Sequence, residues 1–124
     1  MPYQIKWEEN GVYVKFSGDF DFKTSVSANS EILDDPRGNG IRYAIWDTTD
    51  IASVSLTEDE ARLIASRDQV TSTRLLRIKV AIVARDHVMA HLSELYCASY
   101  RSTGTGWDFK ISDSLDSLRV WVNS

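Results

Sequence analysis

The sequence predicts a single α/β domain, built on a five-stranded mixed sheet whose helices lie mainly on one face. Three observations lead to this class. Five short segments have the alternating or continuously apolar pattern of strands, and four segments with a helical period separate them. Their order, β-β-α-β-α-β-α-β-α, favours parallel strands joined by right-handed crossovers. Three of the five strands carry polar residues along one face, so most helices are expected to cover the other face.

The first seventeen residues predict a β-hairpin. Gln4–Trp7 and Val12–Ser17 alternate polar and apolar side chains, and the Glu-Asn-Gly triplet between them is typical of a turn. A helical period follows over Phe20–Asp35. That helix is expected to stop in the segment 35–40, because its proline cannot continue a helix and its glycines loosen the backbone.

The middle of the chain predicts a strand, a loop and a capped helix. Ile41–Trp46 is a strongly β-forming run that is expected to end at Asp47. After the loop, Thr57 and Glu60 have the spacing of a capping box, in which the two side chains satisfy backbone amides at a helix start. Three acidic residues in this first turn suit the positive end of the helix dipole. The helix is expected to run to about Ser72.

A buried strand and a third helix are expected next. Arg77–Ala84 is almost entirely apolar, as in a strand covered on both faces. Asp86 can cap the helix that follows, and Gly104-Thr105-Gly106 is expected to end it. The residues expected on the apolar stripe of this helix are Val88, Leu92, Leu95, Tyr96 and Ser99.

The last segments predict one more strand and a short helix. Trp107–Ser112 alternates apolar and polar residues again. Ser114 opens the final helix, with Leu115, Leu118 and Val122 on one side. No repeat, linker or break in composition interrupts the chain, so residues 1–124 are expected to form one domain.

Composition narrows the function. The 124 residues are 43% apolar, which excludes disordered and low-complexity classes. The net charge of -4 argues against nonspecific nucleic-acid binding. A single cysteine excludes a disulfide scaffold, and no apolar run reaches the length of a spanning helix, so a cytoplasmic domain is expected. Four cations between Asp68 and Asp86 either flank structural elements or form a docking patch for an acidic partner or an anionic membrane surface: Arg74, Arg77, Lys79 and Arg85.

At this length, the order of elements resembles the STAS domain, and more narrowly the SpoIIAA-like family. The resemblance covers nearly the whole chain. Four segments carry it: the hairpin Gln4–Gly18, the strand and acid Tyr43–Asp47, the run Lys79–Val83, and Ser117–Val122, which is similar to the terminal helix of the family. It implies a STAS/SpoIIAA-like fold and a binding domain without catalysis or cofactor.

The resemblance implies two kinds of partner. Anti-sigma-factor antagonists of this fold bind a kinase, which phosphorylates a serine in an Asp-Ser-Ser/Thr-Gly motif where the second helix begins. Here the matching stretch, Ile51–Thr57, has hydroxyls but neither the Asp-Ser pair nor the glycine. The SpoIIAA-like branch lacks this motif and is related in fold to CRAL-TRIO lipid carriers. It implies an apolar ligand and some association with membranes.

Ser53 and Ser55 are the candidate regulatory phosphorylation sites, while Thr57 is expected to act as the helix cap. A phosphate there would gain from the amides and the dipole of the helix start. The acidic residues at 58–60 follow at once, and their repulsion offsets that gain. Hydroxyls that only cap the helix are the simpler interpretation.

Other polar groups are weak candidates for chemistry. His87 and His91 are four apart, a spacing that can place two imidazoles on one metal with Glu94, but a solvated pair is favoured and no metal site is predicted. Asp47 and Asp50 could act as an acid–base pair at a strand end, although caps that accept nearby amides are favoured. Cys97 is expected to be a small buried residue. The segment 104–106 is too short for a phosphate loop, and no catalytic residue is predicted.

The aromatic residues suggest an apolar cleft, against the alternative of a filled core. The helix after the loop has only a weak apolar stripe, Leu63, Ile64 and Val70, so the chain after Asp47 through Val70 is expected to act as a mobile lid. The residues expected to line the cleft are Phe20, Phe22, Trp46, Leu56, Ile64, Met89 and Tyr96.

The sequence therefore supports two hypotheses. The first is a module that holds an apolar small molecule or lipid tail and makes weak contact with membranes. The second is a protein-interaction regulator that docks a protein partner around Ser53–Thr57. An enzyme is disfavoured, and no nucleic acid is expected as a partner. An edge strand or the cationic segment offers a route to a homodimer.

Overall fold

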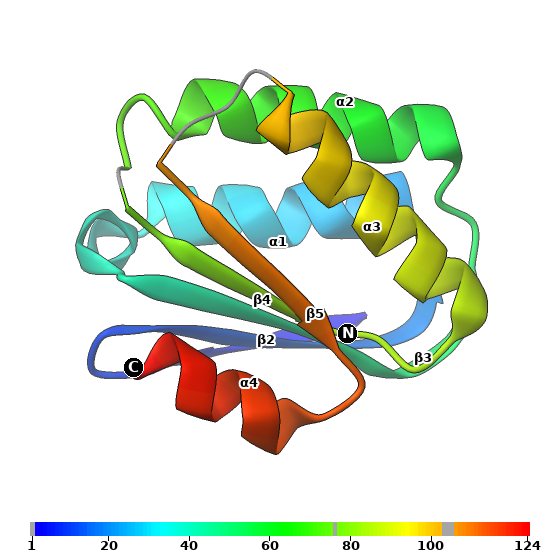
Figure 1. The fold of residues 1–124 in the computed structure, drawn as a ribbon, viewed down its shortest axis with the longest axis horizontal. Helices are drawn as coiled ribbons and strands as arrows, with labels where there is room; N and C mark the ends of the chain where they lie inside the picture. Colours follow the sequence, from blue (N-terminus) through cyan, green and yellow to red (C-terminus); the bar gives the residue numbers. More distant parts are fainter. Residues whose placement is uncertain (1, 76, 103–105) are drawn as a thin grey trace.

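A computed structural model of the chain describes residues 2–75, 77–102 and 106–124. Its centre is one sheet of five strands in the spatial order β1-β2-β3-β4-β5 (Figure 1). β1 runs antiparallel to β2, and the other neighbouring pairs are parallel. The strands are β1 Tyr3–Trp7, β2 Gly11–Phe20, β3 Tyr43–Val54, β4 Lys79–Val83 and β5 Asp108–Ser112. The predicted mixed sheet and the predicted order of elements are confirmed.

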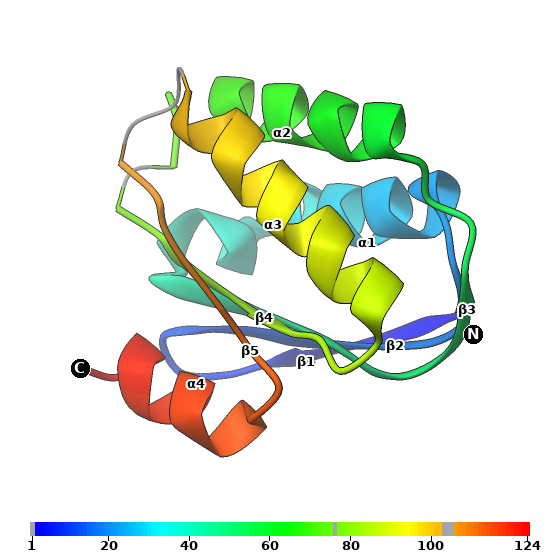
Figure 2. The ribbon, with the colours of Figure 1, turned by 45° about the vertical axis from the view of Figure 1, so that its right-hand side comes forward.

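Helices cover the two faces of the sheet unequally. Three of them lie on one face, and the short C-terminal helix lies on the other (Figures 1 and 2). This arrangement confirms the expectation that the helices gather mainly on one side. The helices are α1 Phe22–Asp34, α2 Glu58–Thr71, α3 His87–Arg101 and α4 Leu115–Val122, with a 3₁₀ turn over Pro36–Gly40. Among the described residues, no helix has the length and apolar character needed to cross a bilayer.

Each α-helix begins at a side chain that accepts a hydrogen bond from a backbone amide of the first turn. These N-cap residues are Asp21, Thr57, Asp86 and Ser114. The predicted capping box is present: the Glu60 amide donates to the Thr57 hydroxyl at 3.2 Å, and the Thr57 amide donates to the Glu60 carboxylate at 3.0 Å. Such caps satisfy amides that have no partner within the helix. The three caps named from the sequence lie where they were predicted.

The alternation along β2 sorts its side chains into two cores. Val12, Val14 and Phe16 are buried in the main core beneath α1, α2 and α3. Tyr13 points to the opposite face, where a smaller core packs against α4. That second core includes Ile45, Ala81, Val83, Leu118 and Val122. β4 contributes to both cores, as predicted for a strand covered on both faces.

The third strand is longer than predicted. Its expected end was Asp47, but β3 continues to Val54. The reason is tertiary, because β2 also extends, to Phe20, and the parallel register pairs Ser17 with Asp50 and Phe20 with Val54. Gly18, at φ 71°, accommodates a register shift between these pairs. Residues 48–54 are therefore part of the sheet, and the expectation that they belong to a mobile lid is wrong.

Two helices differ in part from the predicted buried faces, although Leu92 of α3 is buried as expected and Leu95, Tyr96 and Ser99 are partly buried. In α2 two of the three expected stripe residues are wrong, because Leu63 is 52% exposed and Val70 is 72% exposed, while Ile64 packs against the main core as expected. In α3 Val88 is exposed as well, and its neighbour Met89 is buried instead. The buried residues are Ala61, Ala65 and Asp68 in α2, and Met89, Leu92, Ser93, Cys97 and Tyr100 in α3. α2 packs along α3 and makes few contacts with the sheet. The face of α2 that is buried in this packing is therefore the one that carries its small residues.

Candidate ligand cavity

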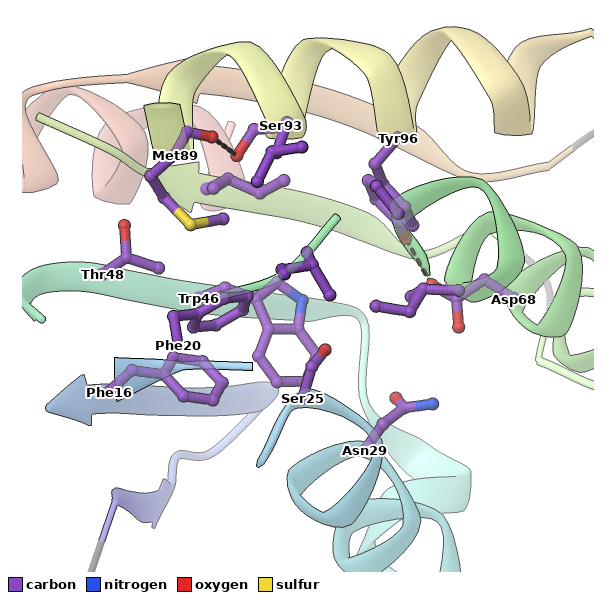
Figure 3. A pocket seen from close by; sticks show the side chains of 15 residues that line it. Phe16, Phe20, Ser25, Asn29, Trp46, Thr48, Asp68, Met89, Ser93 and Tyr96 are labelled. Carbon is purple, nitrogen blue, oxygen red and sulfur yellow. Dashed lines mark hydrogen bonds between the residues drawn. The ribbon is translucent and has the colours of Figure 1, made fainter. Parts of the chain in front are cut away.

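A cavity of about 70 Å³, partly open to solvent, lies between the main face of the sheet and the helices that cover it (Figure 3). Six of the seven residues expected to form an apolar cleft line it: Phe20, Trp46, Leu56, Ile64, Met89 and Tyr96. The seventh, Phe22, packs against the main core without lining the cavity. The chain thus brings residues of three helices and three strands to one hollow.

The cavity exists because α2 presents small side chains to the interior. Ala61 and Ala65 are fully buried, one turn apart. α2 rests against α3 along its length and touches α1 at few points, so the space above the sheet is not closed by a bulky stripe. A longer apolar side chain at position 61 would fill part of this space.

Aromatic rings form the floor of the cavity. Phe16 and Phe20 of β2 meet edge to face with their centroids 5.0 Å apart. Trp46 of β3 stacks on Phe16 at 5.8 Å. Tyr96 of α3 closes another side and packs edge to face on Phe109. These contacts keep the rings in fixed positions, so the cavity has a rigid apolar floor.

A buried carboxylate faces this apolar space. Asp68 of α2 is 6% exposed. The hydroxyl of Tyr96 donates to its Oδ2, while its Oδ1 has no hydrogen-bond partner (Figure 3). Burial raises the pKa of Asp68 to about 6, although the Tyr96 hydrogen bond and the nearby Arg67 charge oppose the shift. An unpaired buried carboxylate oxygen is costly, so this group requires an explanation.

Asp68 lies where two cavities adjoin. A second hollow of about 30 Å³ shares Asn29, Trp46, Asp68 and Tyr96 with the first. Asp68 is not among the site residues predicted from the sequence. The signal was present, because Ala61, Ala65 and Asp68 recur at the i, i+4, i+7 spacing of one helix face. A carboxylate on that face is unusual enough to mark a site.

The other polar groups of the lining differ in whether they are already engaged. The Thr48 hydroxyl donates to the Val83 carbonyl at 2.7 Å, and the Ser93 hydroxyl donates to the Met89 carbonyl at 2.8 Å. The donor hydrogens of these two hydroxyls are therefore already used in hydrogen bonds within the protein. Ser25 and Asn29 of α1 contribute further polar groups, and Figure 3 places Asn29 on the same side of the cavity as Asp68.

The histidine pair does not gather a metal site. His91 Nε2 lies 2.7 Å from the Glu58 carboxylate, a contact between α3 and α2. Among residues 2–75, 77–102 and 106–124, no group of three or more His, Cys, Asp or Glu side chains could hold a metal ion. His87 is exposed. Cys97 is buried as predicted, and burial raises the pKa of its thiol to about 12, so it is a poor nucleophile.

Asp47 and Asp50 do not form an acid–base pair at a strand end, because both lie within β3. Asp47 is buried beside α4, where it accepts hydrogen bonds from the Tyr13 hydroxyl and from the Thr49 amide at 2.9 Å. Burial raises the pKa of Asp47, but these hydrogen bonds outweigh it and the net shift is downward. Asp50 forms an exposed ion pair with Lys15 at 3.1 Å. Asp47 thus accepts a nearby amide as expected, but within the strand and not at a turn.

A polar cluster joins the hairpin to α4 on this second face. Arg119 donates two hydrogen bonds to the Glu8 carboxylate, at 3.0 and 2.8 Å. The Tyr43 hydroxyl donates to the same carboxylate, and the Arg119 guanidinium lies 5.3 Å from the centre of the Tyr13 ring. The hydrogen bond from Arg119 lowers the pKa of Glu8 most, against an opposing effect of burial. The cluster ties structural elements together.

The two candidate phosphorylation sites lie on either side of the end of β3. Ser53 is within the strand, and its hydroxyl donates to Asp19 Oδ1 at 2.7 Å. The Ser55 amide donates to the Phe20 carbonyl at 3.0 Å. Both residues are exposed. A phosphate on Ser53 would face the Asp19 carboxylate and be repelled, so Ser55 is the better placed of the two.

Two of the four cations between Asp68 and Asp86 donate hydrogen bonds to backbone carbonyls within the protein. Lys79 donates to the Trp121 carbonyl at 3.1 Å, near the C-terminal end of α4, and Arg85 donates to the Asp113 carbonyl at 3.1 Å. Arg74 and Arg77 are exposed. Of the segment 104–106, only Gly106 lies within the described residues, and its φ is 96°. The preceding helix α3 ends at Arg101.

Known protein structures share the fold of this chain. No protein-family profile matches the chain, and no curated protein sequence matches it. Solved structures do match, and they define a SpoIIAA-like fold. The anti-sigma factor antagonist SpoIIAA in its unphosphorylated form superposes with a TM-score of 0.61 at 10% identity, over 95% of this chain and 94% of that one.

Two further structures agree. SpoIIAA of Bacillus in its phosphorylated form gives a TM-score of 0.59 at 7% identity, over 97% of this chain and 98% of that one. An uncharacterised protein with a SpoIIAA-like fold from Shewanella loihica PV-4 gives 0.53 at 15% identity, over 97% of this chain and 91% of that one. The predicted fold is therefore confirmed. At these identities the likeness concerns the fold alone, and function must be argued from the site.

Proposed function

We propose that this domain is a non-catalytic binding module whose cavity above the sheet accepts a small apolar molecule or the end of a lipid tail. The observation that carries the proposal is the hollow itself. It has an aromatic floor, is partly open to solvent, and contains a buried carboxylate oxygen without a partner. Small-molecule sites in proteins have this character, mostly apolar with a few placed polar groups.

The volume limits what can enter without rearrangement. At about 70 Å³ the cavity is smaller than the roughly 300–1,000 Å³ of typical ligand pockets. A short alkyl group fits, whereas a full acyl chain requires α2 to move outward. The buried residues of α2 are Ala61, Ala65 and Asp68, so its displacement separates few large apolar side chains, mainly Ile64, from the main core. We therefore propose α2 as the part of the expected lid that moves.

The polar groups outside the cavity support a role without catalysis. Cys97 has a raised pKa and Asp47 a lowered one, so neither is poised for proton transfer or nucleophilic attack near neutral pH. The Asp68 carboxylate is the titratable group best placed to meet a ligand, and the other polar side chains of the described lining are hydroxyls and one amide. These polar groups therefore support ligand binding as the function of the cavity.

A filled-cavity variant tests the proposal. Pentan-1-ol binding to the wild-type protein is measured by isothermal titration calorimetry, together with Ala61→Leu and the matched control Ala98→Leu on the exposed side of α3. We expect the wild type and Ala98→Leu to bind equally and Ala61→Leu to lose binding while remaining folded. Absence of binding to the wild type, or undiminished binding to Ala61→Leu, would overturn the proposal.

A second candidate function is protein-interaction regulation at the end of β3. The likeness to SpoIIAA, solved in unphosphorylated and phosphorylated forms, favours it, as does the exposure of Ser53 and Ser55. Phosphopeptide mapping of the protein from its own host tests this function. Phosphate on Ser55, and a specific partner lost with Ser55→Asp but kept with Ser55→Ala, would support it. An unmodified Ser53–Thr57 segment in the isolated protein would count against it.

A further inference from the structure

Asp68 is the only charged side chain among the described residues that line the cavity. The rest of the lining is apolar, aromatic or neutral and polar. A carboxylate in such surroundings imposes a strong requirement on any molecule that approaches it. In a medium of low dielectric constant, an opposite charge or a strong hydrogen-bond donor is favoured, and another anion is repelled.

The orientation of the carboxylate is fixed by α3. The Tyr96 hydroxyl donates to Oδ2, which leaves Oδ1 without a partner, and the Asp68 side chain lines both cavities. Asn29 of α1 lines both cavities on the same side, as Figure 3 shows. A donor that enters here therefore meets a positioned acceptor, with an amide nearby that can offer a second one.

We infer that the cavity recognises a small apolar molecule carrying a protonated amine, whose ammonium group donates to Oδ1 of Asp68. The inference rests on the proposed function, since it names the chemical class of ligand for the same site. An ammonium has three donors and no acceptor, which suits a carboxylate oxygen beside the Asn29 side chain. The faces of the aromatic floor attract a cation as well, through the ring quadrupoles.

Other head groups satisfy the site less well. A carboxylate or phosphate head would face Asp68 with like charge inside an apolar cavity. A purely hydrocarbon ligand would leave Oδ1 buried and unpaired, which keeps the cost already present in the free protein. A neutral alcohol can donate one hydrogen bond but does not neutralise the charge. The ammonium alone does both.

The protonation of Asp68 makes this recognition depend on pH. Tyr96 faces it from α3, where burial raises the pKa of its hydroxyl further above the range of pH 5 to 8, and the Arg67 guanidinium contributes positive charge from the same helix as Asp68. The other elements around it contribute groups that do not titrate in this range, Asn29 and Ser25 from α1 and Trp46 from the sheet. Protonation of Asp68 on acidification would therefore weaken ammonium binding and leave alcohol binding unchanged.

Calorimetry with a matched ligand pair tests the inference. Pentylammonium chloride and pentan-1-ol, which share one alkyl chain, are titrated at pH 8 into the wild type, Asp68→Asn and the exposed control Asp59→Asn. We expect pentylammonium to bind the wild type at least about tenfold more tightly than pentan-1-ol. Asp68→Asn should remove that preference and Asp59→Asn should keep it. At pH 5 the wild-type preference should fall severalfold.

The outcomes separate the two proposals. If pentan-1-ol binds the wild type as tightly as pentylammonium does, the inference is wrong and the proposed apolar-binding function stands. If neither ligand binds, the proposed function itself fails. If Asp68→Asn does not fold, the wild-type ligand pair and its pH dependence still decide, because a preference that does not change between pH 8 and pH 5 contradicts the role of Asp68.

Discussion

The hydroxyl of Tyr96 donates to one oxygen of Asp68, while the other oxygen of that carboxylate has no partner in the protein. This pairing joins α3 to α2 above the aromatic floor of the cavity (Figure 3). It fixes where the free oxygen lies without satisfying it. A group that costs stability in the unliganded domain is easier to explain as part of a binding site than as part of the core.

The first prediction concerns stability against pH. The pKa of Asp68 rises from 3.8 to about 6 on folding, so between these values the folded protein binds more protons than the unfolded chain. Stability is therefore expected to fall as pH rises through this window. Asp68→Asn lacks this titration and should not show the loss. Between pH 4 and pH 8, the unfolding free energy of Asp68→Asn should therefore rise by about 2–3 kcal/mol relative to that of the wild type.

Urea denaturation at a series of pH values checks this expectation. Asp59→Asn serves as the control, since that carboxylate is 96% exposed. A difference between wild type and Asp68→Asn that stays constant from pH 4 to pH 8 would show that Asp68 does not titrate as its burial requires.

The second prediction concerns the polar cluster beside α4. Arg119→Ala removes two hydrogen bonds from the Glu8 carboxylate, whose side chain is only 16% exposed. We expect a loss of about 1–3 kcal/mol of unfolding free energy, because a partly buried carboxylate is left with fewer donors. Arg62→Ala is the control, since its partner Asp59 is almost fully exposed and such pairs contribute little. Equal losses in thermal or chemical denaturation would contradict this account.

The third prediction concerns a close approach in the sheet. Gly11 pairs with Tyr43, and a Cβ at position 11 would lie 2.5 Å from the Tyr43 ring and 2.6 Å from its carbonyl oxygen. Gly11→Ala should therefore destabilise the protein by about 2 kcal/mol or more. At Gly40 an added Cβ meets nothing within 4 Å, so Gly40→Ala should have little effect. The two variants are compared by thermal denaturation, and similar melting temperatures would contradict the packing described.

Much of the fold could be predicted from local patterns. The hairpin, the Thr57–Glu60 capping box and the Leu118/Val122 face of α4 follow from short-range rules, and each is present. The end of β3 could not be predicted in this way. Its residues 48–54 are held by pairing with the extended end of β2, a long-range interaction that overrides weak local preference.

The site was predictable in its apolar part and not in its polar part. Aromatic and aliphatic residues of separate elements, such as Trp46 and Met89, converge because burial gathers them. The face that α2 buries depends on its packing against α3 more than on its own hydrophobic pattern. For this reason the pattern wrongly predicted that Leu63 and Val70 are buried, and it did not predict the burial of Asp68. Phe22 failed as a lining residue because it packs against the core away from the cavity.

Methyl-selective NMR tests most directly whether this cavity accepts an apolar molecule. Pentan-1-ol is titrated while the methyl groups of Ile64, Ile82 and Met89, which line the cavity, are followed. Leu118 and Val122 in the core beside α4 serve as internal controls. We predict saturable shifts at the three cavity residues and none at the two controls. Shifts spread equally over both faces of the sheet, or no shifts at all, would contradict the account.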